Sequence, residues 1–90
     1  DALLRLTGVE KPSGRLEVCL DDRPGELARL SGELAQQHIN IHSLLTYPCG
    51  EGTVTTVVRV GTLDTRRIAR ELRQKGFVVQ WPPEIPGKSL

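Results

Sequence analysis

Residues 21–27 read DDRPGEL and mark a change in the character of the chain. Before them, apolar and polar residues alternate, and after them apolar residues recur three and four positions apart. Pro24 fixes its own φ and lacks a backbone N–H, which suits the first position of a helix. Gly25 lets the backbone turn tightly. The stretch therefore predicts a sharp strand-to-helix corner whose free backbone N–H groups can bind an anion.

A strand precedes this corner and an amphipathic helix follows it. At 15–20 every second residue is apolar, the pattern of a half-buried strand. The helix is predicted over 24–37, with the carboxylate of Asp22 capping its free N–H groups. Its apolar stripe is expected to consist of Leu27, Leu30, Ser31, Leu34 and Ala35.

The rest of the chain is predicted to add three strands and a second helix. A second helix is expected to begin after an N-cap at Asp64 and to end at Gly76. Leu63 and Ile68 are expected to form a hydrophobic staple across its first turn. The remaining predicted elements are strands at 38–48, 53–60 and 77–81, with a hairpin turn at 49–52.

The predicted order of elements is therefore β-α-β-β-α-β. Two right-handed split βαβ units form a four-stranded antiparallel sheet with both helices on one face, the α+β ferredoxin-like sandwich. The first and third strands are expected at the centre of the sheet and the second and fourth at its edges. Residues 1–14 are interpreted as the linker or tail of a preceding domain, and 82–90 as a C-terminal tail.

Size, charge and cysteine content exclude several classes of protein. Ninety residues suit a single domain, and a net charge of +1 gives no strong attraction to nucleic acid or to a membrane. No apolar run approaches the roughly 20 residues of a membrane span, and no signal-peptide pattern is present. Cys19 and Cys49 are too few for a disulfide scaffold, so a cytoplasmic location is expected.

The chain shows no clear catalytic or metal-binding motif. No carboxylate pair, phosphate-binding loop or catalytic triad stands out, so neither enzymatic activity nor a cofactor is predicted. His38, Asn40 and His42 alternate along the second predicted strand, but their spacing matches no standard zinc ligand set, and no metal site is predicted. The arginines of the second helix are interpreted as a solvated face rather than a nucleic-acid patch.

Several motifs together resemble the ACT domain. They are the corner DRPGEL, a helix ending in AQQ, the following INIHSL and hairpin, and then a strand, a helix and a short last strand, over about residues 15–81. The resemblance implies a small regulatory domain that binds amino acids or similar ligands, usually between paired domains. His38 departs from the family, which often has glycine just after the first helix.

A narrower resemblance concerns the two ends of the chain. LLRLTGVEKPSG near the start and FVVQWPP near the end are similar to bacterial proteins in which two CBS domains precede one ACT domain, the acetoin-utilisation type. This resemblance implies that CBS domains lie upstream of residue 1.

The candidate ligand site joins the corner to Asn40-Ile41. Backbone N–H groups near Gly25 would bind a carboxylate, Asp22 would hold an ammonium group, and Asn40 would contact either. In the alternative interpretation, Asp22 only caps the helix and no ligand binds. The candidate ligand-binding residues are Asp22, Arg23, Pro24, Gly25, Glu26, Leu27, Asn40 and Ile41.

The second predicted strand is an edge without Lys, Glu or Pro before Pro48, and such edges pair readily. A two-fold homodimer is therefore expected through this strand and the first helix, with Asn40 and Ile41 close to the partner's corner. Ligand binding would then tighten the dimer and control attached domains. Two alternatives are an edge covered by other domains and a dimerisation module that binds no ligand.

Overall fold

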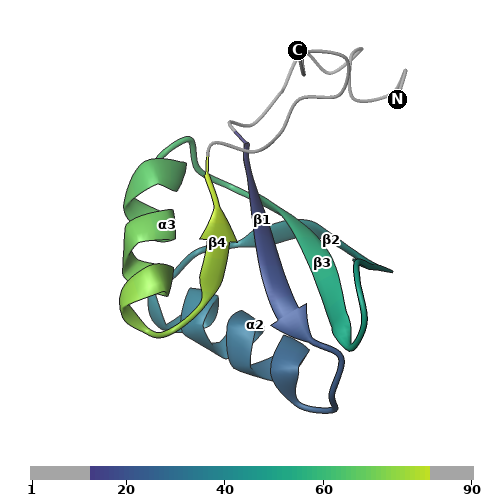
Figure 1. Cartoon of the computed structure of the whole chain (residues 1–90). Helices are drawn as coiled ribbons and strands as arrows, with labels where there is room; N and C mark the ends of the chain where they lie inside the picture. The colour runs from purple at the N-terminus through teal and green to yellow at the C-terminus, as the bar shows by residue number, and fades with distance from the viewer. Residues whose placement is uncertain (1–12, 82–90) are drawn as a thin grey trace, which may run out of the picture.

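The computed structural model describes residues 13–81, which form the expected βαββαβ sandwich (Figure 1). The predicted linker up to residue 12 and the predicted tail at 82–90 lie outside the described residues. The elements in order are β1 (Gly14–Asp21), α2 (Glu26–Gln36), β2 (Ile41–Pro48), β3 (Thr53–Val60), α3 (Thr65–Gln74) and β4 (Val78–Gln80).

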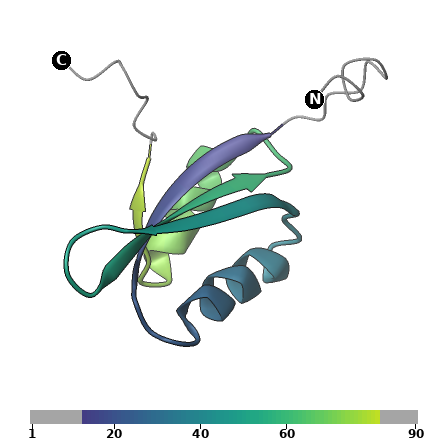
Figure 2. The same ribbon diagram turned by 90° about the vertical axis from the view of Figure 1, so that its right-hand side faces the viewer.

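The four strands form one antiparallel sheet in the order β2-β3-β1-β4. The predicted central and edge strands are thus confirmed. Both helices lie against the same face of the sheet, as Figure 2 shows in a view along its edge. We refer to the other face as the open face.

Alternation along the strands creates the core between the sheet and the helices. Leu16 of β1 pairs with Val58 of β3, and both are fully buried on the helix side. Leu30 of α2 and Leu72 of α3 belong to the same core and are also fully buried. The rest of the core is made of Val18, Leu20, Leu34, Val60, Ile68, Ala69, Phe77 and Val79.

A β-bulge at His42 changes the face pattern predicted for β2. Ile41 pairs with Val60 and Ser43 with Arg59, so His42 is an extra residue in the ladder. Ile41 and Leu44 consequently both pack against the core although they are three residues apart. The expectation that the two histidines alternate on one strand face is wrong, because the bulge interrupts the alternation and His38 lies before the strand.

The starts of the helices differ from the predictions in detail. Helix α2 begins at Glu26 rather than at Pro24, because Gly25 adopts a left-handed conformation with φ of 90° at the N-cap. The predicted cap by Asp22 is wrong, since no side chain among residues 13–81 caps α2. Asp64 occupies the predicted N-cap of α3 but makes no side-chain cap bond, and its carboxylate binds Arg67 Nε instead at 2.8 Å.

Two apolar positions near the helices are more exposed than predicted. The staple between Leu63 and Ile68 does not form, because Leu63 is 71% exposed and Ile68 is fully buried. The predicted stripe of α2 is confirmed for its two buried leucines, whereas Leu27 and Ala35 are exposed.

Both helices end in the same left-handed turn. After α2, His38 N–H donates to Ala35 O and Ile39 N–H to Leu34 O, each at 3.0 Å, which is a Schellman motif. After α3, Gly76 takes the equivalent position with φ of 94°, as predicted. His38 has φ of 60°, a left-handed conformation that is energetically unfavourable for any residue with a Cβ.

We expect His38→Gly to raise the free energy of unfolding by about 0.5–1 kcal/mol, because glycine relieves the left-handed strain and His38 is exposed. Gly76→Ala should lower it by about 1 kcal/mol at the matching turn, where added Cβ meets no atom within 4 Å. Urea denaturation measures the free energy of unfolding of both variants. Equal changes of the same sign in the two variants would contradict the predicted strain at His38.

Two buried threonines provide a second matched pair. Thr56 Oγ1 is buried on the helix side of β3 and has no hydrogen-bond partner among residues 13–81. Thr65 Oγ1 accepts a hydrogen bond from Trp81 Nε1 at 2.8 Å. We expect Thr56→Val to stabilise the fold by about 1 kcal/mol, because it removes an unsatisfied hydroxyl at equal volume.

Thr65→Val should instead destabilise the fold by about 1 kcal/mol, because it leaves the Trp81 N–H without its acceptor. Thermal and urea denaturation distinguish the two outcomes. A loss of stability on Thr56→Val would show that its hydroxyl is satisfied in solution.

Candidate functional site at the β1–α2 corner

The corner is anchored to the β2–β3 hairpin by its backbone. Asp22 N–H donates to Gly52 O at 2.9 Å, directly after β1 ends. Arg23 N–H donates back to Asp21 O at 2.9 Å and closes a tight turn. These two bonds hold the entry to α2 against the β2–β3 hairpin.

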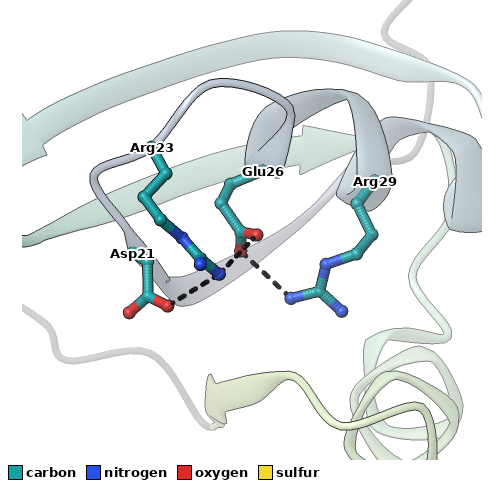
Figure 3. Close-up of polar contacts among 4 residues, drawn as sticks. All are labelled: Asp21, Arg23, Glu26 and Arg29. Carbon is teal, nitrogen blue, oxygen red and sulfur yellow. Dashed lines mark hydrogen bonds and ion pairs between the residues drawn. The ribbon is translucent and has the colours of Figure 1, made fainter.

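A chain of ion pairs crosses the corner (Figure 3). Arg23 lies 3.1 Å from Asp21 and 3.3 Å from Glu26, and Arg29 lies 3.1 Å from the other oxygen of Glu26. Within the part of the chain that the structure describes, Asp22 makes no ion pair and is exposed. Asp22 is thus the carboxylate of this corner that remains available for a cationic group.

The start of α2 presents backbone donors beside these charges. Glu26 N–H is already used, because it donates to Arg23 O at 3.3 Å. The N–H groups of Gly25, Leu27 and Ala28 have no protein acceptor within residues 13–81. The predicted donors are therefore available at Gly25 and Leu27, whereas Glu26 offers its side chain only.

A small cavity of about 190 Å³ opens at this corner. Its polar wall comes from the corner itself, and its apolar wall comes from the ends of the strands on the helix side. The lining residues are Leu20, Asp21, Asp22, Arg23, Glu26, Leu27, Thr46 and Val54. Four of the eight predicted site residues line the cavity, and the exposed corner residues Pro24 and Gly25 do not.

The sequence interpretation missed the apolar wall. Leu20 and Val54 pair across β1 and β3, so both face the helices at the same end of the sheet. Thr46 of β2 pairs with Thr56 and lies one strand further out. The alternation in β1 was a usable signal for Leu20, but the contribution of Thr46 depends on the β2–β3 register, which the sequence does not display.

Asn40 and Ile41 lie at the opposite end of the sheet. Ile41 pairs with Val60, and Asn40 O accepts the N–H of Gly61, beyond the far end of β3. The corner, by contrast, is bonded to Gly52, just before β3 begins. A single chain therefore does not bring the two predicted halves of the site together.

A larger cavity of about 430 Å³ lies elsewhere, along β1 and β4. None of the predicted site residues lines it. Its lining includes Glu17, Cys19, Thr55, Val78 and Gln80, together with Arg73 and Trp81.

The chain thus combines a ferredoxin-like sandwich with a small, partly polar cavity at its first strand-to-helix corner. The family model for the ACT domain matches residues 14–77, and this chain belongs to the ACT-domain family. ACT domains are generally regulatory domains that bind small molecules and dimerise. No solved structure matches the chain significantly. Neither of the described helices is long and apolar enough to cross a membrane.

Proposed function

We propose that this ACT domain binds an amino acid at the β1–α2 corner and that its homodimer transmits the binding to attached domains. The observation that carries the proposal is the cavity of about 190 Å³, which is lined both by the exposed Asp22 and by Leu27, whose backbone N–H has no acceptor among residues 13–81. A free amino acid carries a carboxylate and an ammonium group, which match these two features. Leu27 and Val54 provide an apolar wall for a side chain.

The second half of the site comes, in this proposal, from another copy of the chain. When two β2 strands pair antiparallel about a two-fold axis, the start of one strand lies beside the end of the other. Thr46, near the end of β2, lines the cavity. The pairing would therefore bring Asn40 and Ile41 of the partner subunit to this corner.

The two sheet edges differ in a way that favours β2 as the dimer edge. At the β4 edge, the guanidinium of Arg73 donates to Val79 O at 2.7 and 3.3 Å, so a side chain already binds a backbone carbonyl of this strand. The β2 edge has its bulge at the start and then exposes Leu45 and Tyr47, which are 63% and 44% exposed. On α2, Gly32 is exposed, and a Cβ added there meets no atom within 4 Å, which leaves room for a close approach by the partner's helix.

The resemblance of the chain ends to CBS–ACT proteins of the acetoin-utilisation type suggests what the attached domains are. In this part of the proposal, two CBS domains precede residue 1 in a cytoplasmic protein. Binding at the corner would tighten the ACT dimer and change the relative populations of the arrangements that the CBS domains adopt.

A second candidate function is dimerisation without a ligand. The ion pairs of Arg23 with Asp21 and Glu26 favour it, because they satisfy most of the corner's charges within the chain itself.

A binding screen distinguishes the two functions. Thermal-shift measurements with each of the twenty amino acids, followed by calorimetric titration, should find one or a few that raise the unfolding temperature. The same screen on the protein including its upstream sequence controls for a site that needs the neighbouring domains. If no amino acid changes the unfolding temperature or gives a heat of binding, the domain is a dimerisation module without a ligand and the proposal is wrong.

A further inference from the structure

Two arginines lie directly opposite each other on the open face of the sheet. Arg15 of β1 pairs with Arg59 of β3 in the strand register. Their neighbours Leu16 and Val58 are buried toward the helices, so both arginine side chains lie on the open face. Residues directly opposite in an antiparallel pair have Cβ atoms about 5 Å apart, and like charges at such positions are destabilising. The two central strands thus carry two positive charges next to each other.

The carboxylates of the described residues do not balance this pair. Glu17, the next residue of β1 on the open face, lies 3.1 Å from Arg15 Nη2. Arg59 is exposed and makes no ion pair among residues 13–81. Arg15 Nε is buried and has no hydrogen-bond partner within the same range. One positive charge and one buried donor therefore remain without a partner in this part of the chain.

A third polar group lies in the same row of the sheet. Ser43 of β2 pairs with Arg59 from the other side and is exposed. Its neighbour Leu44 packs against the core, so the Ser43 side chain also lies on the open face. The bulge sets this register, because an uninterrupted ladder would place His42 opposite Arg59. Arg15, Arg59 and Ser43 thus form one row across three adjacent strands, which we call the donor row.

We propose that the donor row binds a phosphate group, either as the free anion or as part of a phosphorylated small molecule. A guanidinium presents parallel N–H donors that match phosphate oxygens, and two guanidiniums can hold one phosphate group between them. A phosphate group carries up to two negative charges near neutral pH, so it balances both arginines, whereas one carboxylate balances only one. The Ser43 hydroxyl can donate to a remaining oxygen.

The surface beside the donor row suits the rest of a phosphorylated molecule. In the next row of the open face, Val57 of β3 pairs with Leu45 of β2, which is exposed and apolar. The donor row lies far from the β1–α2 corner along the strands. Arg59 is the last residue but one of β3, whereas the corner is bonded to Gly52, before β3 begins. Phosphate binding here does not depend on an amino acid at the corner.

The test titrates the complete chain with inorganic phosphate, glycerol 3-phosphate and sodium chloride at matched ionic strength. Both phosphate compounds should raise the unfolding temperature and give a saturable heat of binding, and chloride should do neither to the same extent. Tighter binding of glycerol 3-phosphate would support a phosphorylated molecule as the ligand, and tighter binding of inorganic phosphate would support the free anion. Equal temperature shifts with all three salts would show general screening of charge and overturn the proposal.

Single variants test the role of the arginine pair. Arg59→Gln should weaken phosphate binding about tenfold or more, because one of the two guanidiniums is lost. In phosphate-free buffer of low ionic strength, the same variant should unfold at a higher temperature than the wild type, because the like-charge pair is removed.

The matched control is Arg70→Gln. Arg70 is exposed on α3 and, like Arg59, makes no ion pair among residues 13–81, so its loss should leave phosphate affinity unchanged. Equal losses of phosphate affinity in the two variants would overturn the proposal. A lower unfolding temperature of Arg59→Gln in phosphate-free buffer would also overturn it, because Arg59 would then have a partner within the chain.

Discussion

Leu45→Lys is expected to weaken homodimerisation by about 100-fold, or about 3 kcal/mol. In the proposed dimer the two β2 strands pair antiparallel, and Asn40 of one copy lies beside residues 46–48 of the other. The two-fold axis then passes close to Leu44. The Leu45 side chain, 63% exposed in the single chain, then lies beside the axis. Each dimer would carry two lysines near each other at a partly desolvated interface, so the symmetry doubles the effect of the substitution.

The matched control is Val78→Lys. Val78 is 66% exposed on the same open face, but it belongs to the opposite edge strand, β4. Its substitution adds the same charge and should leave the dimer unchanged. Sedimentation equilibrium over a range of concentrations measures both dissociation constants. A wild-type chain that stays monomeric at high concentration, or equal effects of the two lysines, would exclude β2 as the dimer edge.

Asp22→Asn is expected to lower the affinity for the amino acid found in the screen by about 30- to 100-fold, or about 2–3 kcal/mol. The other two corner carboxylates, Asp21 and Glu26, are paired with Arg23, so Asp22 is the one available for an ammonium group. The asparagine keeps the size of the side chain and removes its charge. Calorimetric titration gives the affinity directly.

Asp64→Asn is the control for this substitution. Asp64 precedes α3 as Asp22 precedes α2, but it pairs with Arg67 at 2.8 Å on another part of the domain. We expect full ligand affinity in this variant. If both variants bind equally well, the ammonium group is not held by Asp22.

The architecture could be predicted because its signals are local. Alternation in β1, the Asp64 N-cap position and the Gly76 stop each depend on a few neighbouring residues. The order of elements then leaves few topologies, since split βαβ units are right-handed. Local energetics also explain why the predicted start of the first helix, at Pro24, was wrong. Proline and glycine both suit a helix start, but Gly25 is left-handed and forms the N-cap, so α2 begins at Glu26.

The site was harder to predict, because it depends on which strand ends meet. DRPG identified the corner, and five of its residues at 21–27 line the cavity. Thr46 and Val54 line the cavity only because of the register between the strands. A single-residue bulge at His42 shifts that register in β2. Whether Asn40 reaches the corner depends on a second chain, which no periodicity within one chain reveals.

A mixing experiment tests the shared site most directly. Asp22→Asn impairs the corner of its own chain, and Asn40→Ala impairs the contribution to the partner's corner, so each homodimer should bind the amino acid weakly. In a mixed dimer, one site combines an unchanged corner with an unchanged Asn40 of the partner subunit. Titration of the equimolar mixture should therefore recover wild-type affinity in one site per mixed dimer. A mixture that binds no better than either variant alone would contradict a site built from two chains.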